Sequence, residues 1–146
     1  MSVFFRAVLL VAVTIIAAGC GSQDDRKPVF PISGRLTFKG EPMTGARVGF
    51  HPLNDPDPRA VRATGTAGED GRFALTTYLT GDGAPAGEYA VTIYWPGKRP
   101  KGQALEPGED AEMPPDRLNR AYADPKTVKL RATVRAEPNA IEFNLP

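Results

Sequence analysis

Residues 88–95, with the sequence EYAVTIYW, decide the fold class of this chain. Apolar and aromatic side chains occupy every second position of the stretch, namely Tyr89, Val91, Ile93 and Trp95. Successive side chains of a β-strand point to opposite faces, so a strand here presents all four to one face. The stretch also has the highest β propensity in the chain. We therefore expect a central strand with Ile93 in the core.

Six further segments show a two-residue alternation and are separated by turn sequences. They are residues 32–38, 46–51, 61–66, 72–78, 127–134 and 140–145. The chain has 15 Gly and 15 Pro, which disfavour long helices. The one helical signal is a short stretch at 115–122, which begins with Pro and places Leu118 and Tyr122 four residues apart. Seven short strands joined by turns predict an all-β, antiparallel sandwich.

The amino terminus has the pattern of a secretory signal. An apolar run of 12 residues, 7–18, is shorter than the roughly 20 residues that a membrane span needs. The sequence Ala17-Ala18-Gly19-Cys20 follows and resembles a bacterial lipobox, in which small residues precede the Cys that is lipidated, although Ala17 stands where Leu is more common. We expect residues 1–19 to be a lipoprotein signal peptide and Cys20 to be the site of lipid attachment.

This signal divides the chain into three parts. Residues 20–31 are polar and interrupted by Pro28 and Pro31, so they are expected to form a flexible tether that starts at the lipidated Cys20. Residues 32–146 are long enough for one small domain. We expect the protein in the bacterial cell envelope, held by this lipid to a membrane, with the outer membrane and its periplasmic or surface side as the expected place.

Charge and residue counts exclude several classes of protein. The chain has 18 basic and 17 acidic residues, which argues against nucleic-acid binding driven by phosphate attraction. It has one His and one Cys, so internal disulfides, Cys/His zinc clusters and Cys–His catalysis are ruled out. His51, with Asp55 and Asp57 in the next loop, forms at best a weak metal site and is more typical of a half-exposed strand end. We expect no catalytic residues, no metal and no cofactor.

Residues 96–114 form the candidate contact surface. The basic residues Lys98, Arg99 and Lys101 come first, and acidic residues follow, with almost no apolar residue between them. We expect an exposed loop that contacts an envelope protein or polysaccharide, while a solvated insertion without a partner is the alternative. Tyr94 and Trp95 next to it either stack on a sugar ring or fill the core, and the core is favoured.

Short runs of turn and strand residues follow Cys20 in order. They are residues 32–42, 45–50, 70–73, 85–93, 122–125 and 139–145. In this order they resemble the carboxypeptidase-regulatory-like (transthyretin-like) domains of bacterial lipoproteins, notably those of planctomycetes. The resemblance implies a seven-stranded antiparallel Greek-key sandwich of the prealbumin type. It implies no activity, because such domains accompany enzymes and surface proteins alike.

The expected function combines the anchor with the sandwich. We expect a membrane-anchored bacterial lipoprotein whose domain is a non-enzymatic module with a structural or binding role in the cell envelope. The alternative is a small envelope hydrolase or ligand carrier built on the same sandwich.

Overall fold

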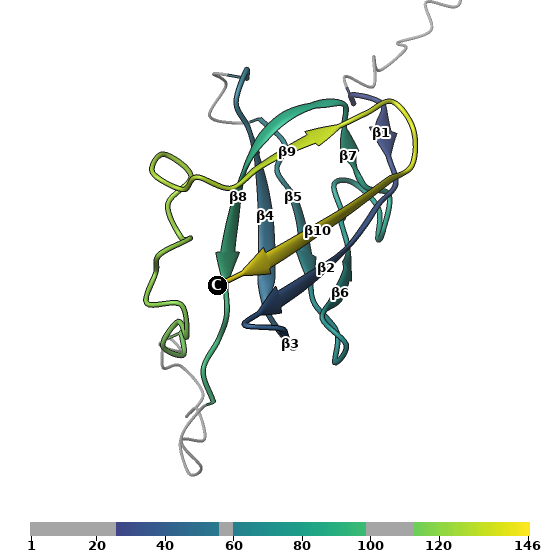
Figure 1. Cartoon of the computed structure of the whole chain (residues 1–146). Helices are drawn as coiled ribbons and strands as arrows, with labels where there is room; N and C mark the ends of the chain where they lie inside the picture. The colour runs from purple at the N-terminus through teal and green to yellow at the C-terminus, as the bar shows by residue number, and fades with distance from the viewer. Residues whose placement is uncertain (1–25, 56–59, 99–112) are drawn as a thin grey trace, which may run out of the picture.

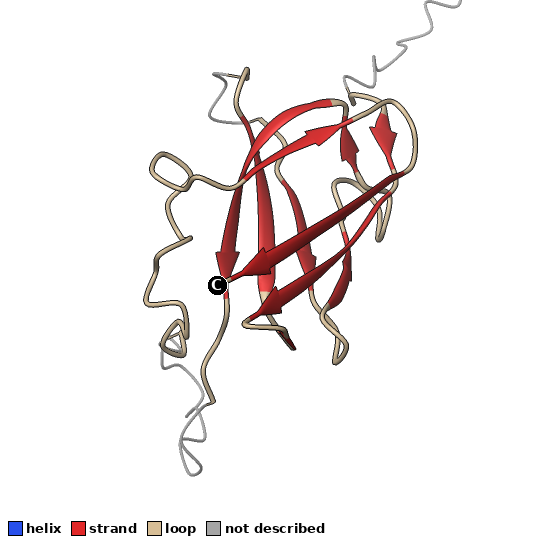
Figure 2. Ribbon diagram, in the orientation of Figure 1, coloured by secondary structure: helices blue, strands red, loops and turns tan. Residues whose placement is uncertain are grey.

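The computed structural model describes residues 26–55, 60–98 and 113–146. Within these ranges it consists of strands, turns and loops and contains no helix (Figures 1 and 2). Two four-stranded sheets pack face to face around one core. The all-β, sandwich-like prediction is therefore confirmed for this part of the chain.

Several predictions fall on residues outside the described ranges. The signal peptide at 1–19, the lipid attachment site Cys20 and residues 99–112 of the contact segment all lie there. For the ranges that are described, no helix is long and apolar enough to span a membrane.

The first sheet contains the stretch that decides the fold. Its strand order is β5 (Ala63–Thr66), β4 (Arg47–Pro52), β8 (Gly87–Tyr94) and β9 (Arg131–Val134), and every neighbouring pair is antiparallel. Strand β8 lies inside this sheet, as predicted, and Ile93 is fully buried.

The second sheet is built around β2 (Ile32–Phe38). Strands β3 (Glu41–Pro42) and β6 (Arg72–Ala74) pair with it antiparallel. Strand β10 (Asn139–Leu145) pairs with it in parallel, with Asn139 opposite Ile32 and Leu145 opposite Phe38. The prediction of a wholly antiparallel sandwich is therefore wrong for this pair. Alternation shows which side chains are buried, but it does not show which strand is the neighbour or in which direction it runs.

A two-stranded ribbon closes one end of the sandwich. Strand β1 (Val29–Phe30) pairs antiparallel with β7 (Ala84–Pro85). The predicted tether at 20–31 therefore does not extend through residues 29 and 30. The side chains of Val29 and Phe30 are partly buried, and this apolar packing is what a solvated tether lacks.

The predicted helical stretch at 115–122 forms turns instead. Both oxygens of the Asp116 carboxylate accept backbone N–H groups, Oδ1 from Leu118 at 3.0 Å and Oδ2 from Arg120 at 3.0 Å. Asn119 and Arg120 have φ angles of 51° and 62°, in the left-handed region. An α-helix needs negative φ at successive residues, so it cannot continue here.

The core joins the two sheets through aromatic contacts. The ring of Phe50 on β4 lies 6.4 Å from that of Phe143 on β10, in the opposite sheet, and 5.6 Å from that of Tyr89. The four alternating side chains of 88–95 are all buried, as predicted, and this includes Trp95. The core placement of Trp95 is thus confirmed, and its indole N–H donates to the Thr44 carbonyl at 3.0 Å.

Candidate functional site

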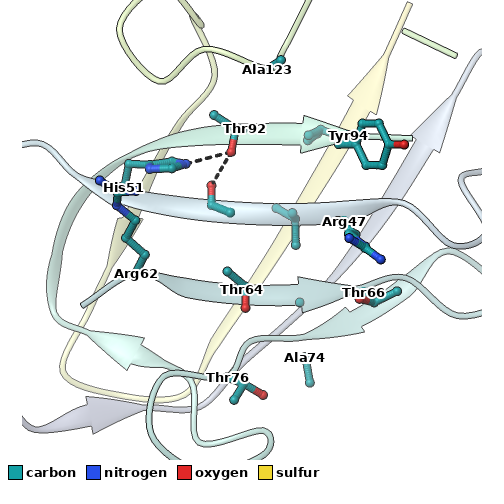
Figure 3. A pocket seen from close by; sticks show the side chains of 14 residues that line it. Arg47, His51, Arg62, Thr64, Thr66, Ala74, Thr76, Thr92, Tyr94 and Ala123 are labelled. Carbon is teal, nitrogen blue, oxygen red and sulfur yellow. Dashed lines mark hydrogen bonds between the residues drawn. The ribbon is translucent and has the colours of Figure 1, made fainter. Parts of the chain in front are cut away.

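The outer face of the sheet β5-β4-β8-β9 is hollowed into a groove of about 770 Å³, which we call the outer-face groove (Figure 3). Side chains from β4, β5 and β8 form its floor. Among them are Arg47 and His51 from β4, Thr64 from β5, and Thr92 and Tyr94 from β8, and Arg62, the residue directly before β5, adds its side chain.

The alternation of β4 creates the floor of the groove. Val48 and Phe50 are buried between the sheets, so Arg47, Gly49 and His51 face outward. Gly49 pairs with a threonine on each side, one from β5 and one from β8. Because glycine has no side chain, the centre of the groove stays low, and a Cβ at this position would lie 2.9 Å from the Thr92 hydroxyl oxygen.

Chain segments from outside the sheet contribute to both sides of the groove. On the β8 side, the Ile93 N–H donates to the Tyr122 carbonyl at 2.9 Å, and the next residue, Ala123, lines the groove. On the β5 side, Thr64 and Thr76 exchange two backbone hydrogen bonds of 3.0 and 2.8 Å. These contacts hold segments distant in sequence at the groove.

The charge of the groove is positive. Arg47 and Arg62 are exposed, no Asp or Glu lines the groove, and within the described residues neither arginine makes an ion pair. Arg47 lies opposite Thr66, and Ala63, the residue after Arg62, lies opposite Phe50. The two arginines are therefore about 13 Å apart along the strands, at opposite ends of the groove.

His51 is held within the groove by a hydrogen bond. Its Nε2 and the Thr92 hydroxyl oxygen are 2.8 Å apart, and that hydroxyl also lies 3.4 Å from the Gly49 carbonyl, to which it donates. Burial, and then the nearby charge of Arg62, lower the pKa of His51 below its ordinary value of 6.5. The imidazole is therefore neutral at pH 7.

The lowered pKa of His51 predicts a specific pH dependence of stability. The unfolded chain binds a proton near pH 6.5 while the folded chain still resists it, so protonation favours unfolding. The stability present above the unfolded pKa is lost as the pH falls through the folded pKa. We expect the wild-type protein to lose stability relative to a His51→Gln variant as urea denaturation is repeated from pH 7.5 down to pH 5. A relative gain on acidification contradicts the prediction.

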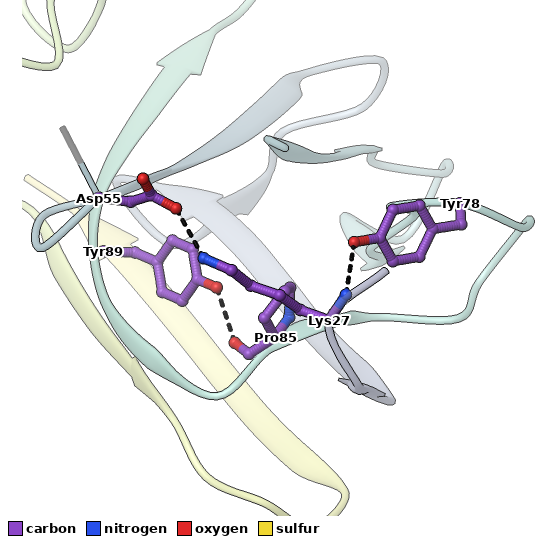
Figure 4. Close-up of polar contacts among 5 residues, drawn as sticks. All are labelled: Lys27, Asp55, Tyr78, Pro85 and Tyr89. Carbon is purple, nitrogen blue, oxygen red and sulfur yellow. Dashed lines mark hydrogen bonds and ion pairs between the residues drawn. The ribbon is translucent and has the colours of Figure 1, made fainter. Parts of the chain in front are cut away.

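A second cavity, of about 400 Å³, lies where the described chain begins. Figure 4 shows the polar contacts among five of its lining residues. The Lys27 ammonium is 2.7 Å from the Asp55 carboxylate, and the Lys27 backbone N–H donates to the Tyr78 hydroxyl at 3.1 Å. The Tyr89 hydroxyl donates to the Pro85 carbonyl at 2.7 Å, and burial, with Tyr78 and Asp55 nearby, raises its pKa. These polar groups are occupied with one another, which makes this cavity a weaker candidate for a ligand.

No protein-family model, curated protein or solved structure matches the sequence.

The structure places the predicted site residues in different surroundings. In the described ranges no group of three or more His, Cys, Asp or Glu could hold a metal ion, and Asp55 pairs with Lys27. The two ends of segment 96–114 are held together, because the Gly97 N–H donates to the Pro115 carbonyl at 2.8 Å. Tyr94 lines the outer-face groove, and its hydroxyl donates to the Pro114 carbonyl at 2.5 Å.

Sequence reasoning missed the groove itself. In the sequence analysis, neither Arg47 nor Arg62 is assigned a role, although the alternation of 46–51 places Arg47 on the face opposite Val48 and Phe50. The signal was therefore present for one arginine. The sequence alone does not show that β4 pairs with β5, and this pairing brings Arg62 to the same face as Arg47.

Proposed function

We propose that the protein is a membrane-anchored bacterial lipoprotein whose domain is a non-enzymatic binding module of the cell envelope. Lipid on Cys20 holds it to the membrane, with the outer membrane as the proposed place and the periplasm or cell surface as the side that it faces. The outer-face groove is the proposed contact surface, and segment 96–114 adjoins it through the Tyr94–Pro114 hydrogen bond.

One observation carries this proposal: the described residues that line the groove include arginines and hydroxyls but no carboxylate. Charged and hydroxyl groups facing an open hollow favour binding of a polar ligand, since they supply hydrogen bonds and charge to it. General acid–base or nucleophilic chemistry needs a set of groups held in mutual geometry. Among the described residues of the groove, His51 and Thr92 are the only pair that approaches this.

That pair supports the alternative, a small envelope hydrolase, only weakly. A base beside a nucleophilic hydroxyl becomes cationic in the transition state, and a third group normally stabilises the cation and orients the ring. Here the nearby Arg62 opposes a cationic His51, and among the described residues no carboxylate lines the groove. The Thr92 hydroxyl is moreover directed to the Gly49 carbonyl. We therefore favour binding over catalysis.

The proposal includes membership of the carboxypeptidase-regulatory-like (transthyretin-like) group with its seven-stranded Greek-key order. The two packed sheets and the absence of helix in the described residues support it. The parallel pair of β2 and β10 is a feature that any such assignment must accommodate.

The anchor is tested by replacing Cys20 with Ser. Only a thiolate accepts the diacylglycerol group at this position, so the variant is expected to remain an uncleaved precursor that incorporates no labelled fatty acid in bacterial cells. Incorporation is followed by metabolic labelling, and cleavage by the mass of the protein. If the serine variant still takes up labelled fatty acid, the anchor lies elsewhere.

A further inference from the structure

We propose that the ligand of the outer-face groove is an acidic polysaccharide, whose anionic groups pair with Arg47 and Arg62. This inference rests on the proposed function, because it names the class of ligand for the same surface. It adds the charge of the ligand, its polymeric nature and the two residues that select it.

Arg47 and Arg62 differ from most other arginines of the described chain in being available to a ligand. Most other arginines of the described chain already have a partner. Arg35 donates to the Asp70 carbonyl, Arg72 pairs with the Asp70 carboxylate, Arg117 stacks on Trp95, Arg131 donates to two carbonyls and Arg135 pairs with Glu137. Among the described residues, Arg47 and Arg62 make no such contact, and both are exposed in a hollow that no described acidic residue lines. Two guanidinium groups are thus free to bind carboxylates or sulfates, whose geometry they match.

The spacing of Arg47 and Arg62 favours a polymeric ligand. The two arginines are about 13 Å apart along the strands, at opposite ends of the groove (Figure 3). This arrangement suits anionic groups on separate units of one chain better than a single small anion. A polymer that lies along the groove can engage both arginines together, and the second contact then forms at a high effective concentration.

The groove lining between the two arginines offers hydroxyl groups. This lining includes the hydroxyls of Thr64 and Thr76, and the ring of Tyr94 lies beside Arg47. Hydroxyl side chains can donate to and accept from the hydroxyls of a sugar. The phenol of Tyr94 is held by its bond to the Pro114 carbonyl, so its ring is fixed in place beside the ligand.

The same features disfavour two other polymers. An extended peptide is usually bound by pairing with a free strand edge, whereas the groove lies on a face whose central strand β4 is paired on both sides. A single-stranded nucleic acid is usually held by several aromatic rings that stack on successive bases, and Tyr94 is the one aromatic residue that lines the groove within the described chain.

The experiment uses the mature lipidated protein in micelles of a non-ionic detergent. Polygalacturonate serves as the carboxylated polymer, dextran sulfate as the sulfated polymer, dextran as the neutral polymer and a short single-stranded oligonucleotide as an unrelated polyanion. Affinities are measured by calorimetric titration at moderate and at high salt. Polygalacturonate or dextran sulfate is expected to bind, and which of the two binds more tightly identifies the anionic group.

The test variant is Arg47→Gln/Arg62→Gln, in which binding of the acidic polymer is expected to fall by a factor of about ten or more. Its matched control is Arg35→Gln/Arg72→Gln, which removes the same charge from exposed residues of the other sheet and should stay within about twofold of wild type. Equal losses in the two variants overturn the inference, because binding then follows net charge alone. The inference is also overturned if dextran or the oligonucleotide binds more tightly than the acidic polymers, or if neither acidic polymer binds.

A third variant separates this inference from the proposed function. Thr64→Val/Thr66→Val removes two groove hydroxyls and leaves the charge unchanged. If this variant loses binding of dextran while the double arginine variant retains it, the groove binds a neutral glycan. The proposed function then stands and the acidic class is wrong. If no polymer responds to either groove variant, the groove is not the contact surface and both fail.

Discussion

Replacing Gly34 with Ala is expected to lower the free energy of unfolding by about 3 kcal/mol or more. A Cβ at this position would lie 2.3 Å from the carbonyl oxygen of Ile141 and 2.4 Å from the ring of Phe73. Neither neighbour can move cheaply, since Ile141 belongs to the parallel ladder with β2 and the Phe73 ring is buried. The substitution therefore forces β10 away from β2 or displaces a core side chain.

Gly68→Ala provides the control for this prediction, because its added Cβ would meet nothing closer than 3.6 Å. Its stability is expected to stay within about 1 kcal/mol of wild type. Urea denaturation followed by the fluorescence of Trp95 measures both variants on the same scale. If Gly34→Ala is as stable as Gly68→Ala, the close contact of β2, β10 and Phe73 is not present in solution.

Replacing Ile93 with Ala is expected to cost about 2 to 5 kcal/mol. Ile93 lies in β8, inside its sheet, and none of its surface is exposed. Its truncation removes apolar contacts and leaves a cavity that neighbours on both sheets cannot fill completely, since the core is closely packed.

Leu79→Ala is the matched aliphatic control, because 69% of Leu79 is exposed. We expect this change to alter the free energy of unfolding by about 0.5 kcal/mol or less. Thermal and urea unfolding of the two variants give the comparison. A cost at Ile93 no larger than that at Leu79 is incompatible with a core position for β8.

The sequence predicts the strands well where one face is buried and the other solvated. Residues 88–95 show this most clearly, because Tyr89, Val91, Ile93 and Trp95 are buried as the alternation predicts, and Ala90 is the one buried residue on the other face of the strand. The ends of strands are harder to predict. The predicted strand 127–134 begins only at Arg131, since the N–H groups of Thr127 and Val128 bond to the Asp124 carbonyl in a turn. Such local hydrogen bonds compete with the ladder and leave no mark on the alternation.

Contacts between distant segments were not predictable from the pattern. Strands β1, β3 and β7 have two residues each, which is too short for a period to be recognised. The groove was not predictable either, because Arg62 and Thr92 come together only through the pairing of β5 and β8 with β4. A single sequence indicates whether a residue faces inward or outward, but it does not indicate which residue lies opposite it on the neighbouring strand.

The parallel pairing of β2 with β10 has a mechanical consequence for a domain held by its amino terminus. If the proposed lipid at that end and the proposed ligand in the groove pull against each other, the tension first meets the contacts of Lys27 with Tyr78 and Asp55 and the β1–β7 pair. Once these contacts yield, the tension reaches β2 at Ile32. All seven residue pairs with β10, from Asn139–Ile32 to Leu145–Phe38, then resist sliding together. A ladder loaded in this way breaks all at once, whereas a hairpin pulled open at one end separates bond by bond. Tension that reaches the second sheet is thus carried by the longest continuous pairing in that sheet.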